Sequence, residues 1–151
     1  MRPIEKIKSS AKVTEVVALR KERKLPLIHE KANIEEVIDT MTRFQYSRLL
    51  YVVDDDKKLT GTISLGLLAR HVFSTIHEPQ IHPRFLINMI TAETAKDIMQ
   101  KNLVVTTEEE KVEVVLRRMI RTNAKEIPVL DKEERVVADL TMVDFLKFIL
   151  N

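Results

Sequence analysis

Hydrophobic and polar positions follow a helical period in two segments of the chain, and the two segments match each other. Residues 32–41 (ANIEEVIDTM) and 110–119 (EKVEVVLRRM) both place apolar side chains at i, i+3, i+4 and i+7. This spacing is typical of a helix with one buried face. Short apolar runs at 25–28 (LPLI) and 103–106 (LVVT) precede the segments and favour buried strands. The pattern therefore predicts a strand and then an amphipathic helix in each half.

The correspondence continues after these helices. Residues 49–54 (LLYVVD) correspond to 126–131 (EIPVLD), and residues 58–70 (KLTGTISLGLLAR) to 135–147 (RVVADLTMVDFLK), 77 positions further on. In both copies a charged turn separates two strand-like runs, which predicts a hairpin, and the second run leads directly into an apolar helix. Each copy is therefore predicted to be a β-α-β-β-α unit.

The repeat also predicts the domain organisation. We expect a lead-in and the first motif in residues 1–74, a linker in 75–94 and the second motif in 95–151, with short lead-in helices at 13–17 and 95–99. A unit of about fifty residues buries too little apolar surface to be stable alone. The two units are therefore expected to pack together by pseudo-twofold symmetry, and the predicted fold class is α+β.

Local side-chain pairs indicate where the first long helix of each motif begins. Asn33 with Glu36, and Thr107 with Glu110, have the spacing of capping pairs. We expect each pair to cap the helix that follows it.

Composition narrows the functional classes. The 151 residues are 44% hydrophobic and 32% charged, which is typical of a globular chain. Lys and Arg number 25 against 23 Asp and Glu, so no strongly basic surface for nucleic acid is expected. The absence of cysteine excludes disulfides, thiolate zinc sites and a cysteine nucleophile. The polar start argues against a signal peptide, and the lack of a long apolar run argues against a membrane span. A cytoplasmic location is therefore expected.

Candidate chemistry is sparse. The two glycines, Gly61 and Gly66, match neither the P-loop nor the dinucleotide fingerprint, and the four histidines lack zinc-ligand spacing. A triad of Ser64, His71 and a residue of 54–56 lacks a nucleophile elbow, so no catalytic or metal-binding residues are predicted.

Two polar residues stand out in the mostly apolar segment 136–150. Thr141 and Asp144 lie at the predicted junction of strand and helix. Free backbone N–H groups and the helix dipole at such a junction favour an anion. The same residues could instead only cap the helix, and both interpretations stay open.

The ordered pair of units resembles a tandem pair of CBS domains, the cystathionine-β-synthase type of regulatory motif. The resemblance is carried by residues 103–119, 126–131 and 136–144 with their first-copy counterparts, and covers roughly residues 13–150. It implies a stand-alone, non-enzymatic module that binds an adenosine nucleotide in the cleft between the motifs and transmits occupancy by conformational change. AMP, ADP or ATP is the expected ligand, with S-adenosylmethionine as another candidate. The resemblance also implies a homodimer formed through helices and a separate protein partner. The candidate contact of the dimer is the apolar stripe 112–120 together with its counterpart in the first copy.

The resemblance further implies roles for individual residues. Asp144 would accept hydrogen bonds from the ribose hydroxyls, and Thr141 would donate to a phosphate. The first copy has Ser64 and Leu67 at these positions, so its ribose carboxylate is missing and one nucleotide per chain is expected.

Further ligand contacts are expected on both motifs. Lys125 and Arg48 would neutralise phosphates, and the adenine would lie against the backbone near Leu25 and Pro26, with Ser47 nearby. Glu126 would repel phosphates, so it either points outward or indicates a ligand with fewer phosphates.

Two alternatives remain. In the first, the module is a structural or interaction dimer, and the Thr141–Asp144 pair is only a cap. The second concerns the basic cluster Arg20, Lys21, Arg23 and Lys24, which is interpreted as a solvated face or as a phosphate-facing segment.

Overall fold

The computed structural model describes residues 10–44, 47–73 and 93–151, and they form two compact units. One unit combines residues 10–25 with 104–151, and the other lies within 26–103. The first motif contains β1 (Leu27–His29), α2 (Ile34–Arg43), β2 (Leu49–Val53), β3 (Leu59–Ser64) and α3 (Leu65–Val72). The second contains β4 (Thr106–Thr107), α6 (Val112–Thr122), β5 (Glu126–Leu130), β6 (Val136–Thr141) and α7 (Met142–Leu150). Two shorter helices are α1 (Val13–Leu19) and α5 (Ala95–Ile98).

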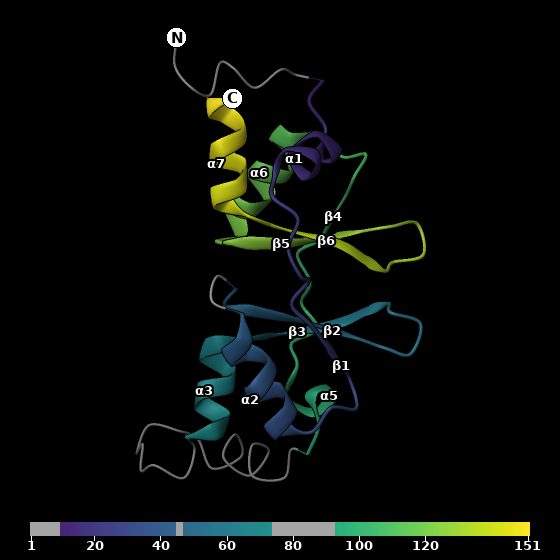
Figure 1. Ribbon diagram of the computed structural model, residues 1–151, viewed down its shortest axis with the longest axis vertical. Coiled ribbons are helices and arrows are strands. Elements are labelled where there is room, and N and C mark those ends of the chain that lie inside the picture. The colour runs from purple at the N-terminus through teal and green to yellow at the C-terminus, as the bar shows by residue number, and fades with distance from the viewer. Residues whose placement is uncertain (1–9, 45–46, 74–92) are drawn as a thin grey trace. The chain divides into compact units, whose positions relative to one another are not determined.

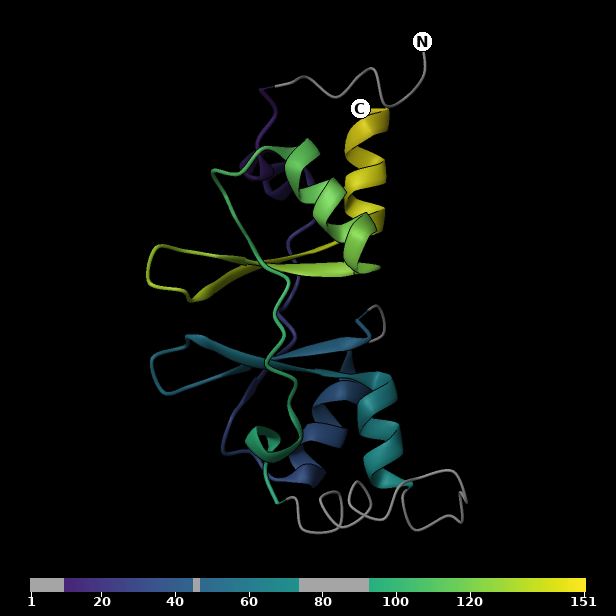
Figure 2. The same cartoon turned by 180° about the vertical axis from the view of Figure 1, so that it is seen from behind.

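Each unit is built on a three-stranded mixed sheet. The strand orders are β1-β2-β3 and β4-β5-β6; in both, the first pair is parallel and the second antiparallel. Figure 1 shows α2 and α3 on one face of the first sheet, and α6 and α7 on one face of the second; Figure 2 shows the same arrangement from behind. The predicted α+β class with two β-α-β-β-α motifs is therefore confirmed.

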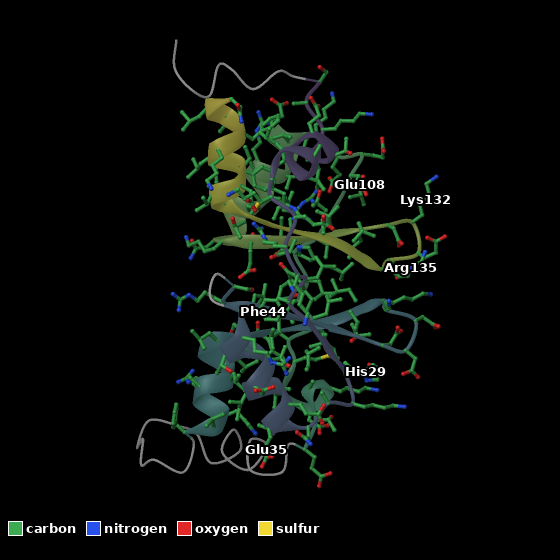
Figure 3. All side chains as sticks on the ribbon, viewed as in Figure 1. His29, Glu35, Phe44, Glu108, Lys132 and Arg135 are labelled. Atoms are coloured by element: carbon green, nitrogen blue, oxygen red, sulfur yellow. The ribbon has the colours of Figure 1, made fainter. Side chains whose placement is uncertain are left out.

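The hairpins of the two motifs repeat even their irregularities. The register shifts between Val52 and Val53 in β2, and between Val129 and Leu130 in β5. Both turns begin with an aspartate whose Oδ1 accepts two backbone N–H groups: those of Asp56 and Lys58 at Asp54, and those of Glu133 and Arg135 at Asp131. Figure 3 shows Lys132 and Arg135 at the end of the second hairpin. The charged turns predicted from the sequence thus share one hydrogen-bonding design.

Each motif takes its lead-in helix from the other half of the chain. Val13 and Val16 of α1 are buried in the core of the second motif, and the Val13 N–H donates to the carbonyl of Glu110 over 2.9 Å. Ala95 of α5 is buried in the core of the first motif, and its N–H donates to the carbonyl of Ala32 over 2.8 Å. The sequence order of lead-in and motif is therefore not their order in space. Most of the expected linker, residues 75–94, lies outside the described residues.

One expected capping pair is confirmed and the other is wrong. The Glu36 N–H donates to Oδ1 of Asn33 over 2.9 Å at the start of α2. Helix α6 instead begins after Lys111, and Glu110 bonds to the guanidinium of Arg118. The arginine is a stronger partner for the carboxylate than a backbone N–H group, because both groups are charged.

The apolar side of α6 is used within its own unit. Val112, Val115 and Met119 are fully buried in the core, so the expectation that residues 112–120 contact a second copy is wrong for these side chains. The large apolar side chains exposed on α7 are Val143, Leu146 and Leu150. Among the described residues, no helix combines the length and apolar character needed to cross a bilayer.

Candidate functional site

The candidate site is the junction at which β6 ends and α7 begins. Thr141 is the N-cap of α7, and its Oγ1 accepts the N–H of Asp144 over 3.3 Å. In return, Oδ2 of Asp144 accepts the Thr141 N–H at 2.8 Å and the Thr141 hydroxyl at 3.1 Å. This reciprocal pair satisfies backbone donors that a helix start leaves without partners. The capping role considered from the sequence is therefore present in the structure.

Asp144 has a second partner that the capping role does not require. Arg23, from the irregular segment between α1 and β1, donates from Nη2 to Oδ2 over 2.6 Å and from Nη1 to Oδ1 over 3.3 Å. Its Nη2 also donates to the backbone carbonyl of Asp139 over 2.9 Å. The Asp144 side chain is only 9% exposed. A planar guanidinium fork on a shielded carboxylate is among the stronger polar contacts in proteins.

The charges of this pair are mutually stabilised. Burial raises the pKa of Asp144, but the hydrogen bond from Arg23 and the N–H of Thr141 outweigh it, and the net pKa is lowered. The hydrogen bond to Asp144 raises the pKa of Arg23 despite burial, and the carboxylates of Asp139 and Glu126 add to this effect. Asp144 therefore remains an ionised acceptor at neutral pH.

Glu126 belongs to the same environment. It is 8% exposed and lies opposite Thr141 in the pairing of β5 with β6. The interpretation in which Glu126 points out to solvent is therefore wrong. Its negative charge adds to the field around Arg23.

A second Thr-x-x-Asp pair in the chain shows what capping alone looks like. At the start of α5, Oδ2 of Asp97 accepts the N–H and the hydroxyl of Thr94 at 2.9 and 3.1 Å. The N–H of Glu93 donates to the same oxygen over 3.0 Å, and Asp97 is exposed. Capping thus requires neither burial nor an arginine, and these two features distinguish Asp144.

The equivalent junction of the first motif lacks the carboxylate. Ser64 is the N-cap of α3, and its Oγ accepts the N–H of Leu67 over 3.1 Å. The hydroxyl therefore keeps the capping half of the arrangement, whereas the leucine side chain offers no hydrogen-bond acceptor. This is the asymmetry between the copies that the sequence indicated.

Lys125 and Leu25 lie in the same unit as Asp144. Lys125 is exposed, its ammonium donates to Oδ1 of Asn123 over 3.0 Å, and its carbonyl accepts the N–H of Met142 at 2.8 Å. Leu25 is partly buried.

The remaining expected site residues lie in the other unit. Arg48 is exposed, and its carbonyl accepts the N–H of Leu65 over 2.8 Å, just as that of Lys125 accepts the N–H at the start of α7. The hydroxyl of Ser47 donates to the carbonyl of Leu49 over 2.6 Å. Pro26 is buried, and its carbonyl accepts the N–H of Tyr51 over 2.8 Å. Their roles toward a ligand stay predictions.

Sequence reasoning missed Arg23 as a partner of Asp144. It was one of four basic residues in a charged run, and 121 positions separate it from the carboxylate. No local spacing connects the two. In the parts of the chain that the structure describes, no three His, Cys, Asp or Glu side chains come together as metal ligands would.

The fold and this junction define the class of protein. The family model of the CBS domain matches residues 13–74 and 95–151, and the chain therefore belongs to the CBS domain family as a tandem pair. Among curated proteins, the chain is 26% identical over 110 residues to a homoserine O-acetyltransferase from Methanosphaera stadtmanae, of which it spans 19% of the length.

Solved structures of CBS pairs have the same fold. A CBS domain-containing protein from Thermotoga maritima is 27% identical, with a TM-score of 0.70 over 92% of this chain and 94% of that one. The CBS domain pair of protein MJ0100, in complex with 5′-methylthioadenosine and S-adenosyl-L-methionine, is 22% identical, with a TM-score of 0.66 over 91% and 94%. CBSX2, in complex with AMP, is 18% identical, with a TM-score of 0.73 over 93% and 96%.

Proposed function

We propose that this CBS pair is a regulatory module that binds an adenosine nucleotide at the junction of β6 and α7. The observation that supports it is Asp144, an ionised carboxylate at a helix start that is shielded from solvent, a property that capping alone does not require. Two CBS pairs of the same fold were crystallised with adenosine-containing ligands: CBSX2 with AMP, and the pair of MJ0100 with 5′-methylthioadenosine and S-adenosyl-L-methionine. The proposed ligands are AMP, ADP, ATP or S-adenosylmethionine.

In this proposal both hydroxyl groups of the ribose diol donate hydrogen bonds to the Asp144 carboxylate. A charged acceptor makes these hydrogen bonds stronger than a neutral one would. Lys125 is proposed to supply positive charge for a phosphate: its carbonyl accepts the N–H of Met142 at the helix start, and its ammonium is exposed and donates to Asn123. Ser47, Arg48, Leu25 and Pro26 are proposed to complete the contacts with phosphate and adenine. Leu67 takes the place of the carboxylate in the first motif, so we propose one ribose site per chain.

The module is proposed to regulate and not to catalyse. Ligand binding changes the conformation of the pair because the two states differ in affinity for the ligand. We also propose that the module forms a homodimer and that a separate protein partner binds the two conformations with different affinity. Solution scattering profiles that superimpose with and without bound ligand would contradict this transmission.

Calorimetric titration with AMP, ADP, ATP and S-adenosylmethionine tests ligand binding. We expect at least one to bind with a stoichiometry of one per chain, and Asp144→Asn to lose that binding while circular dichroism shows an intact fold. The matched control is Asp97→Asn, which alters the same kind of cap at α5 and should bind as the wild type does. Equal affinity in the two variants would contradict the ribose role of Asp144.

A second candidate function is an interaction module without a ligand. The completed cap at Thr141 and the arginine on Asp144 favour it, because they satisfy the carboxylate without any nucleotide. In that case none of the four ligands binds or raises the melting temperature, since only a ligand that prefers the native state stabilises it.

A further inference from the structure

Thr141 and Arg23 together occupy most of the acceptor positions of Asp144. An ionised carboxylate offers about four lone-pair sites, two on each oxygen. Oδ2 accepts three donors, the N–H and the hydroxyl of Thr141 and Nη2 of Arg23, whereas Oδ1 accepts only Nη1 of Arg23. At most one site, on Oδ1, is left. A ribose diol requires two acceptor sites, so it cannot bind with both hydroxyls while Arg23 stays in place.

Only the donors of Arg23 can leave without opening the helix cap, although the Asp139 carbonyl also loses its bond from Nη2. Thr141 belongs to the helix cap, and loss of its contacts would leave N–H groups at the start of α7 without partners. Arg23 is on a segment without regular structure, and its side chain is one-third exposed. Its departure would leave both sites of Oδ1 open and would expose the guanidinium to water, which solvates it well.

We infer that Arg23 is the intrachain competitor of the ribose diol at Asp144, and that its displacement sets the affinity of the site. The inference rests on the proposed nucleotide function and assigns a specificity-determining residue to it. The guanidinium presents two N–H donors in a rigid fork, as the diol presents two O–H donors, so both satisfy one carboxylate in the same way. Either the arginine or the diol occupies Asp144, but not both.

The first motif supports this pairing of the two residues. The position that corresponds to Arg23 is Lys101, 78 residues further on, and it is exposed. Its unit has Leu67 where Asp144 would be. An arginine thus stands at this position in the unit that has the carboxylate, and a lysine stands at the equivalent position in the unit that has Leu67.

The test compares Arg23→Met with the wild type by calorimetric titration of adenosine and of 2′,3′-dideoxyadenosine. Adenosine carries the diol without phosphate, so any loss of charge attraction to a phosphate does not enter. We expect Arg23→Met to bind adenosine roughly tenfold to hundredfold more tightly, the factor typical of one hydrogen bond to a charged group. The affinity for the dideoxy compound should not change. Lys21→Met removes the same charge from an exposed side chain of the same segment and should bind adenosine as the wild type does.

Each result supports or overturns the inference. Tighter binding of adenosine alone supports it, as does binding that appears only in the variant. Unchanged or weaker binding in Arg23→Met overturns it and leaves the proposed function intact, provided that the wild type binds and Asp144→Asn does not. Absence of binding in both proteins overturns the inference together with the proposed function. If Arg23→Met does not fold, Arg23→Lys replaces it, because a single ammonium loses the fork and should give a smaller gain in the same direction.

Discussion

Gly61 lies where β3 touches the backbone of the chain that follows α5. A methyl group at this position would come within 2.5 Å of Sδ and 2.7 Å of Cγ of Met99, and within 2.9 Å of the carbonyl oxygen of Gln100. The Met99 side chain can rotate away. The Gln100 carbonyl cannot, because it accepts the N–H of Thr62 over 2.9 Å, and the Gln100 N–H returns a bond of 2.8 Å. Gly61→Ala must therefore disturb the contact by which α5 joins the first motif.

The two effects of this substitution have opposite signs. Overpacking of a close contact costs about 1–3 kcal/mol. Loss of backbone freedom in the unfolded chain returns about 0.4–1 kcal/mol. The free energy of unfolding should therefore fall by about 1.3 kcal/mol, the difference between the midpoints of these two ranges. Each kcal/mol lowers the melting temperature by about 2–4 °C in a chain of this size.

The chain supplies its own control in Gly66. A methyl group there meets nothing within 4 Å, and the residue is exposed in the first turn of α3. Gly66→Ala should therefore raise the free energy of unfolding by about 0.4–1 kcal/mol. Urea unfolding followed by far-UV circular dichroism measures both variants. If Gly61→Ala proved as stable as Gly66→Ala, the close approach of α5 to β3 would be refuted.

Two other predictions concern acid sensitivity and self-association. The hydrogen bond from Arg118 lowers the pKa of Glu110 below its ordinary value of 4.5 despite burial. The ionised carboxylate therefore stabilises the fold above pH 4.5. This stabilisation is lost as the pH falls through the lowered pKa. Glu110→Gln should therefore unfold in less urea at neutral pH, and its difference from the wild type should shrink in acid; a difference that does not depend on pH would contradict this role. Leu146, 56% exposed on α7, is proposed to contact a second copy, so Leu146→Glu should shift sedimentation from dimer to monomer while Lys147→Glu does not. A Leu146→Glu protein that sediments as the wild type does would exclude this face.

Elements determined by neighbouring residues could be predicted from the sequence. The helical period of α2 and α6, the apolar runs of the strands and the charged turns each depend on a few adjacent positions. The cap at Asn33 was predicted for the same reason, because its partner is three residues away. The Thr107 cap was wrong because α6 begins only after Lys111 and Glu110 pairs instead with Arg118, eight residues further along the chain. Charge attraction there prevails over local spacing.

Features that depend on the path of the chain could not be predicted. The valines of α1 pack in the core of the second motif, and no local pattern in the sequence assigns them to it. The contact of Arg23 with Asp144 depends on that assignment, because α1 carries the segment after it into the same unit. The packing of α1 against the second motif thus determines both the exchange of the lead-in helices and the environment of the candidate site.

The contact of Arg23 with Asp144 links the lead-in segment to the proposed nucleotide site. If α1 had remained with the first motif, Arg23 would face a junction whose equivalent of Asp144 is Leu67, and a guanidinium would have no carboxylate to bind. The exchange instead brings Arg23, on the irregular segment that follows α1, into the unit that contains Asp144. Under the proposed function, a protein that binds this segment and holds Arg23 away from Asp144 is expected to raise the affinity for the nucleotide. By linkage, the nucleotide would then strengthen the binding of that protein by the same factor.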